Sequence, residues 1–154
     1  MIFVRDLLVI VAVMGDTYVR GRFLMATAVA LPRPDLAAHR EALTLPWQEL
    51  VKRLIDMVGR KLTAYIAGVK DVRALDRWIA GVEPYGDVEA RLRFAYQVAR
   101  TLNEHDSPRV VQAWLTGVNP ELGDRVPLRL LKEGNLDEIA PKVLGAARAF
   151  IAGA

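Results

Sequence analysis

The sequence contains no cysteine, only two histidines and a single serine, and these shortages exclude several kinds of site. Without cysteine the chain can form no disulfide, no thiolate zinc site and no cysteine nucleophile. A Ser-His-Asp hydrolase or a multi-histidine metal site is hard to build from Ser107, His39 and His105 alone. Neither a G-x-G-x-x-G pattern nor a Walker A pattern is present. We therefore expect that the protein is not an enzyme and that it holds no cofactor or metal.

The sequence also lacks a hydrophobic run long enough to cross a membrane. The apolar run from Leu7 to Met14 has eight residues, whereas a membrane-spanning helix needs about 20. Arg5 is neutralised by the adjacent Asp6 and no A-x-A cleavage pattern follows the run, so it does not have the features of a secretory signal. We expect a cytoplasmic protein with no membrane contact.

Residues 1–31 differ in character from the rest of the chain. The run from Leu7 to Met14 is rich in Val and Ile, which favours a short strand or hydrophobic arm, and a disordered extension is the alternative. Met25 is a second possible start, which would make residues 1–24 an upstream extension. Otherwise these residues form an arm that packs on the body of the protein or on a second subunit.

The positive charge of the chain is concentrated in one window. The 154 residues are 53% hydrophobic and 25% charged, which predicts one domain or two very small ones with a sizeable core. The net charge is +3, but residues 51–77 alone contain seven Lys and Arg against three Asp, a net charge of +4. Localised positive charge is typical of a nucleic-acid-binding surface, and a solvated basic face is the alternative.

From residue 35 onward, glycines and prolines divide the chain into short segments with apolar residues at intervals of three and four, which predicts helices. Asn135, with Glu138 three residues later, gives a capping-box-like start to the last helix, and Pro141 resets or kinks it. The expected helices cover residues 35–43, 46–58, 61–67, 71–80, 88–104, 108–116, 120–122, 127–133 and 136–152. We therefore predict an all-α fold, a small helical bundle, with an extension at 1–44 and two regions at 45–105 and 106–154.

Residues 61–84, KLTAYIAGVKDVRALDRWIAGVEP, predict a helix-turn-helix. Gly68 allows a left-handed turn between two short helices, so that the second can cross the first steeply. We expect six buried positions, at Ala64, Ala67, Val69, Leu75, Trp78 and Ile79. We expect six exposed positions on the second helix, at Lys70, Asp71, Arg73, Ala74, Asp76 and Arg77. An ordinary helical hairpin is the alternative.

Five cations of this motif are the candidate DNA contacts. A recognition helix presents its N-terminal part to base edges, and Arg is the usual reader of guanine. We therefore assign base contacts to Arg73 and Arg77, with Lys70 beside them. Arg60 and Lys61, at the start of the first helix, are placed to contact phosphates.

Residues 111–134, VQAWLTGVNPELGDRVPLRLLKEG, carry more large apolar side chains than isolated short helices can bury. We expect a buried cluster of Trp114, Leu115, Leu122, Leu128 and Leu131, held as a rigid platform of short helices around an Asn-Pro turn. The charged groups left exposed on it are Asp124, Arg125, Arg129, Lys132 and Glu133, which either contact a partner or are simply solvated.

The two motifs resemble the two halves of the Xre/MbcA/ParS family of antitoxins. Residues 62–84 resemble the helix-turn-helix of Xre-type regulators through Ala67, Gly68-Val69, Trp78, Gly81 and Pro84. Residues 111–134 resemble the toxin-binding domain of the family through the spacing W-L-x-x-x-N-P-x-L-G-x-x-x-P-x-x-L-L, which is the more specific of the two. The resemblance covers residues 45–152. Two acids, Asp71 and Asp76, depart from what a reading helix needs, because phosphates repel carboxylates.

The resemblance implies an antitoxin that binds its own promoter DNA and neutralises a RES-fold toxin, an enzyme that consumes NAD. Arg125, Arg129 and Lys132 are then the candidate toxin-binding residues. The alternative is a stand-alone helical interaction module, or a transcription regulator without a toxin partner.

Two further expectations concern the longer helices. One helix-turn-helix reads only a short site, so we expect a homodimer on a palindrome. In the helix 88–104, Phe94, Tyr96 and Val98 lie outside the apolar stripe, and we place the dimer contact there. The last helix, from Pro141 to Ala152, either covers a pocket of the partner or is the final core helix.

Overall fold

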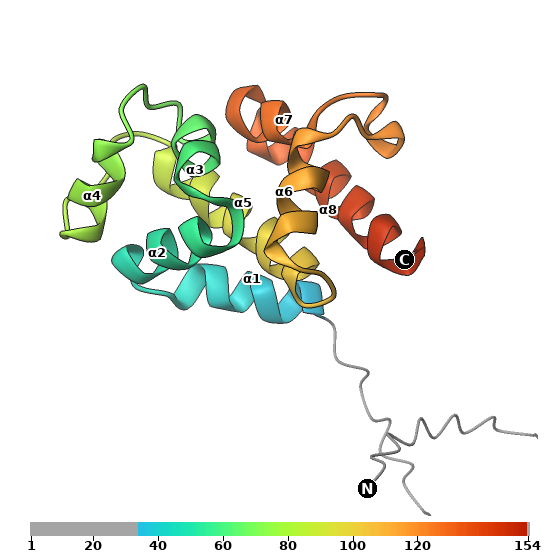
Figure 1. Cartoon of the computed structure of the whole chain (residues 1–154), viewed down its shortest axis with the longest axis horizontal. Helices are drawn as coiled ribbons and strands as arrows, with labels where there is room; N and C mark the ends of the chain where they lie inside the picture. Colours follow the sequence, from blue (N-terminus) through green and yellow to red (C-terminus); the bar gives the residue numbers. More distant parts are fainter. Residues whose placement is uncertain (1–33, 154) are drawn as a thin grey trace, which may run out of the picture. The chain divides into compact units, whose positions relative to one another are not determined.

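A computed structural model describes residues 34–153, and every regular element in this range is helical. The all-α prediction is confirmed for this part of the chain, which forms a small bundle (Figure 1). The predictions for residues 1–31, including the alternative start at Met25, lie outside the described residues. In chain order the elements are α1 (Pro34–Thr44), α2 (Trp47–Val58), α3 (Arg60–Ile66), α4 (Arg73–Ile79), α5 (Val88–Asn103), α6 (Pro108–Thr116), the 3-10 turn η1 (Pro120–Leu122), α7 (Pro127–Glu133) and α8 (Leu136–Gly153).

Local signals set the ends of most helices where the sequence predicts them. Gly59 separates α2 from α3 with a φ of +86°, a conformation that a residue with a Cβ adopts only under strain. Asn135 caps α8, since its side-chain oxygen accepts a hydrogen bond from the Asp137 N–H at 3.1 Å. Pro141 does not end this helix, which continues through it to Gly153. Pro141 and Asp137 are both exposed, so water can solvate the Asp137 carbonyl that the missing N–H leaves unpaired.

The helix α5 occupies the centre of the bundle, and this overturns the expected dimer contact. It packs against α1, α2, α3, α6, α7 and α8. Tyr96 is 1% exposed and Val98 is fully buried, while Phe94 is half-buried and packs against the same core, so most of the apolar surface outside the main stripe is covered within the same chain. A helix surrounded by neighbours needs an apolar surface wider than one stripe. The wide apolar surface of α5 is therefore explained by its central position in the bundle and not by contact with a second subunit.

One continuous core joins the regions on either side of residue 105. Buried side chains from Ala42 to Ala147 form a single cluster, to which α2, α4, α5, α6, α7 and α8 all contribute. Trp47 of α2 meets Trp78 of α4 edge to face, with ring centroids 5.8 Å apart. Burial raises the pKa of the Tyr96 phenol above its ordinary value. Because they share this core, the short helices hold fixed positions that none of them could hold alone.

None of the helices between Pro34 and Gly153 has the length and apolar character needed to cross a bilayer. In the same range, no group of three or more His, Asp or Glu side chains is arranged so that it could hold a metal ion.

Candidate functional site

The predicted helix-turn-helix corresponds to α3, the connection 67–72 and α4. Gly68 in the connection has a φ of +73°, the left-handed conformation that the sequence suggests for this turn. Helix α4 packs on α2 and α3 through Leu75 and Trp78, which are 0% and 6% exposed. One face of α4 is thus anchored in the core and the opposite face is turned to solvent.

The predicted burial pattern of this motif is confirmed at most positions and differs at three of them. Ala74, expected on the exposed face, is 4% exposed. It precedes Trp78 by four residues, about one helical turn, and therefore shares its buried face. Val69 and Ile79 are half-buried. The exposed charged residues of the connection and α4 are Lys70, Asp71, Arg73, Asp76 and Arg77.

The two acids that depart from the pattern of a reading helix are both engaged within the protein. The Asp71 side chain accepts a hydrogen bond from the Arg73 N–H at 2.9 Å and so caps the start of α4. The Asp76 carboxylate pairs with the guanidinium of Arg60 at 2.6 Å. This pair neutralises an acid on α4, but it also occupies the cation that the sequence assigns to phosphate.

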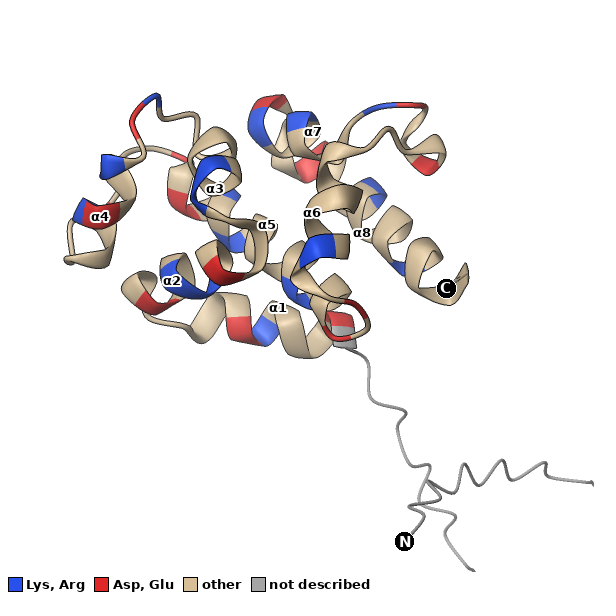
Figure 2. Cartoon of the chain, viewed as in Figure 1, with Lys and Arg blue, Asp and Glu red and all other residues tan. Residues whose placement is uncertain are grey.

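Four other cations of the motif remain after that pairing. Lys61, Lys70, Arg73 and Arg77 are all exposed, and within residues 34–153 none of them takes part in an ion pair. Figure 2 shows blue segments on α3, on the connection and on α4. The motif therefore presents positive charge that the rest of the described chain does not neutralise.

The C-terminal platform is built as predicted. The residues expected to pack together are buried: Trp114, Leu115, Leu122, Leu128 and Leu131. Asn119 fixes the segment 119–125 around η1 with two hydrogen bonds: its side chain accepts from the Glu121 N–H at 2.9 Å, and its own N–H donates to the Arg125 carbonyl at 3.1 Å. The short helices are thus fixed by both packing and hydrogen bonds.

Only two of the three predicted toxin-binding residues lie together. Arg125 and Arg129 line one hollow of about 430 Å³ beside α7, and the acids Asp124 and Glu133 line the same hollow. The Arg125 Nε donates to the Leu122 carbonyl at 3.0 Å, and Arg129 lies 3.6 Å from the Glu133 carboxylate. Lys132 points elsewhere, because its Nζ lies 4.3 Å from the centre of the Tyr65 ring on α3.

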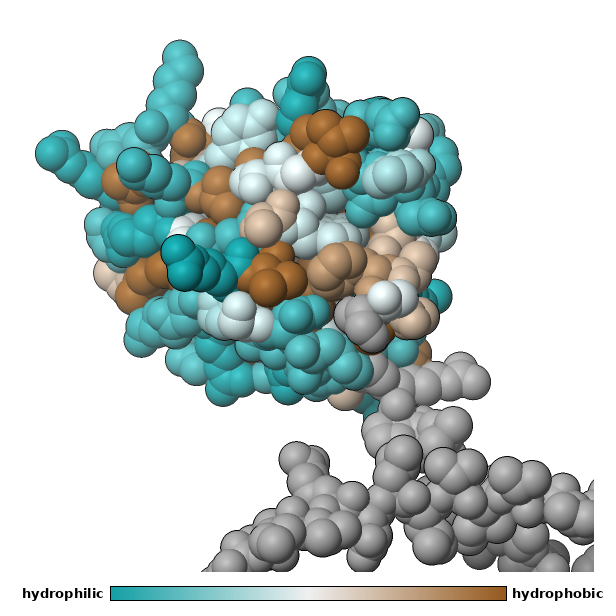
Figure 3. All heavy atoms as spheres, turned by 45° about the vertical axis from the view of Figure 1, so that its right-hand side comes forward, coloured by the Kyte–Doolittle hydropathy of each residue, from teal (hydrophilic) through white to brown (hydrophobic). Residues whose placement is uncertain are grey.

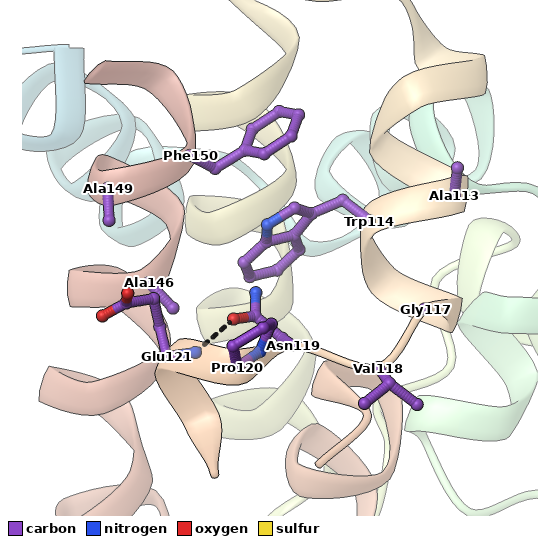
Figure 4. Close-up of a pocket in the computed structure, with 10 residues that line it drawn as sticks. All are labelled: Ala113, Trp114, Gly117, Val118, Asn119, Pro120, Glu121, Ala146, Ala149 and Phe150. Atoms are coloured by element: carbon purple, nitrogen blue, oxygen red, sulfur yellow. Dashed lines mark hydrogen bonds between the residues drawn. The ribbon is translucent and has the colours of Figure 1, made fainter. Parts of the chain in front are cut away.

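An apolar groove between α6 and α8 is a feature that sequence reasoning missed. Two adjoining hollows of about 360 and 500 Å³ share Ala113, Trp114 and Phe150. Trp114 from α6 and Phe150 from α8 both point into the space between the two helices (Figure 4). The Trp114 Nε1 is buried and has no hydrogen-bond partner among the described residues. The pattern of the last helix contained Phe150, but only the packing of α6 shows what it faces.

No family model, no curated protein and no solved structure matches this chain.

Proposed function

We propose that the protein is a DNA-binding antitoxin, which holds promoter DNA with α3 and α4 and a RES-fold toxin with its C-terminal helices. One observation carries the proposal. The helix-turn-helix presents Lys61, Lys70, Arg73 and Arg77 without ion-pair partners in residues 34–153, while both of its acids are engaged. If these cations had only a structural role, local ion pairs with neighbouring acids would stabilise the helices by a few tenths of a kcal/mol each. This surface leaves its cations available to phosphates.

The position of the two arginines on α4 supports a role in base reading. Arg73 is the first residue of α4, and Arg77 follows it by four residues on the same exposed face. Helix-turn-helix proteins contact base edges with the N-terminal residues of the second helix, and Arg can donate two hydrogen bonds to guanine. Lys61 on α3 and Lys70 in the connection both precede this helix in the chain and suit phosphate contacts, which position the protein without reading sequence.

The toxin-binding part of the proposal rests on the hollow beside α7. Arg125, in the loop before α7, and Arg129, on α7, are exposed residues of its lining, and the neighbouring short helices are fixed by a shared core. Planar guanidinium groups on a rigid support suit carboxylates of a protein partner, which they bind through two hydrogen bonds. Lys132, held over Tyr65, has a smaller part in this contact.

The DNA-binding part is tested by fluorescence anisotropy with the DNA upstream of the gene and with a scrambled duplex. We expect the double variant Arg73→Ala, Arg77→Ala to lose its preference for the upstream DNA, at a cost of about 1–3 kcal/mol for each base contact. The matched control is Lys142→Ala, which removes an exposed cation from α8 and should leave binding unchanged. Equal preference in the double variant and the parent protein would refute the assignment.

The toxin-binding part is tested by co-expression with a RES-fold protein encoded beside the gene. We expect the charge reversal Arg125→Glu, Arg129→Glu to release the toxin and stop growth, while DNA binding persists. Continued protection by a variant that stays folded would exclude the hollow beside α7 as the toxin contact.

A further inference from the structure

The groove between α6 and α8 is separate from both surfaces assigned above. None of the residues that line it belongs to α3, to α4 or to the hollow that contains Arg125 and Arg129. Its middle is apolar, and the α8 side carries Ala146 and Ala149, whose small side chains let another element approach closely. Val118 on its lining is 64% exposed. Figure 3, which turns this side of the molecule forward, shows hydrophobic atoms exposed between hydrophilic ones.

The two ends of the groove carry opposite charges. Arg109, in the first turn of α6, lines the end that also includes Ser107 and Val110. Glu121, on η1, lines the other end. Both side chains belong to exposed residues, and neither takes part in an ion pair within the part of the chain that the structure describes. Along the groove the order is therefore a cation, an apolar middle and an anion.

This order of cation, apolar middle and anion allows two copies of the groove to pair with each other through a two-fold axis. If the axis passes through the middle of the groove, near Trp114, it exchanges the two ends of the groove. It brings Arg109 of one copy opposite Glu121 of its mate, brings Glu121 opposite the mate's Arg109, and lets the apolar middles face each other. In a symmetric dimer the same patch serves on both subunits, so a contact made once is made twice. Electrostatic complementarity of this kind sets the register and excludes wrong partners.

We propose that the groove between α6 and α8 is a homodimer interface, with a second copy of this chain as its occupant. The contact covers Val118 and the apolar middle, and two Arg109–Glu121 pairs close its ends. It replaces the expected contact through α5, which is buried within one chain. The inference does not depend on DNA binding or toxin binding, and its test requires neither partner.

Sedimentation equilibrium of the full chain between 1 and 300 micromolar tests the proposal. We expect a mass that rises from 17.1 kDa to twice this value. Glu121→Arg and Arg109→Glu each place like charges at both ends of the interface, so each should raise the dimer dissociation constant about tenfold or more. Combined in one chain they restore the opposite charges, and the dissociation constant should return toward that of the parent protein. Ala113→Glu, at an exposed position in the apolar middle, should abolish the dimer.

The matched control is Lys142→Glu, a charge reversal on α8 outside the groove, which should leave the mass unchanged. Circular dichroism of each variant checks that it is folded. Three results would overturn the proposal: a monomer at every concentration, a dimer that neither charge reversal weakens, or single reversals that the combined variant does not rescue. The first would also be the result if another segment of the chain, or another protein, is the occupant.

Discussion

Replacing Asp76 by asparagine should strengthen DNA binding while leaving the fold almost unchanged. The Asp76 carboxylate lies 2.6 Å from the Arg60 guanidinium, and the two side chains are 60% and 42% exposed. An ion pair this exposed contributes about 0–1 kcal/mol to stability, so its loss should shift the melting temperature by only a few degrees. The substitution removes a negative charge from α4, the helix that we propose to contact DNA, and releases a cation beside it.

The size of the effect follows from the number of cations on the surface. Lys61, Lys70, Arg73 and Arg77 neutralise about four phosphates for each bound helix-turn-helix, which predicts that log K falls with log salt with a slope of about −3.6. Release of Arg60 adds a fifth contact and steepens the slope to about −4.5. When the salt concentration rises from 50 to 200 mM, one additional phosphate contact makes the loss of affinity about 3.5-fold greater. A dimer on a palindrome doubles both slopes.

Fluorescence anisotropy at a series of salt concentrations measures this slope directly. The matched control is Asp137→Asn, which removes an exposed carboxylate at the start of α8, far along the chain from the helix-turn-helix. It should leave the slope unchanged. If Asp76→Asn left the slope unchanged or made it shallower, Arg60 would not face DNA and the proposed orientation of α3 and α4 would be wrong.

Three further predictions concern the stability of the bundle. A Cβ at Gly134 would lie 2.6 Å from the Ile139 Cγ2 and 2.7 Å from the Leu130 carbonyl; Gly134→Ala should therefore lower the free energy of unfolding by about 1–3 kcal/mol in urea titrations. The matched change Gly145→Ala, in open space on α8, should raise it by up to about 1 kcal/mol, and a loss of stability there would contradict the geometry. Leu131 is fully buried in the shared core, so Leu131→Ala should lower the free energy of unfolding by about 2–5 kcal/mol. Both the parent protein and the variant should unfold in one cooperative transition, and two transitions would show that the halves unfold separately. Because burial raises the pKa of Tyr96 in the folded state, the unfolded state loses this proton first, from about pH 10 upward. The free energy of unfolding should then fall as the pH rises from there toward the folded-state pKa. Tyr96→Phe should reduce this slope, and an unchanged slope would exclude Tyr96 as its source.

Much of the local structure is determined by the sequence alone. Gly59, Gly68 and the prolines at the starts of α6, η1 and α7 act on their own backbone and immediate neighbours, so their effect does not depend on the rest of the fold. For the same reason the left-handed turn at Gly68 agrees with prediction. The charge window at 51–77 contains the four cations of the helix-turn-helix that are unpaired within residues 34–153, although Arg53 in the same window pairs with Glu41 and Glu49 outside it.

What only the tertiary structure decides is which residues meet across the chain. An apolar stripe shows that a helix has a buried face, but it does not show how many neighbours cover it, and α5 was therefore mistaken for a dimer helix. The pairing of Arg60 with Asp76 and the contact of Lys132 with Tyr65 join residues 16 and 67 positions apart. These distant contacts, and the groove where α8 comes to lie beside α6, depend on the packing of helices whose order in the chain does not specify their neighbours. The sequence therefore determines which chemical groups the protein has, whereas the packing of the helices determines which of these groups are exposed and unpaired and so able to contact another molecule.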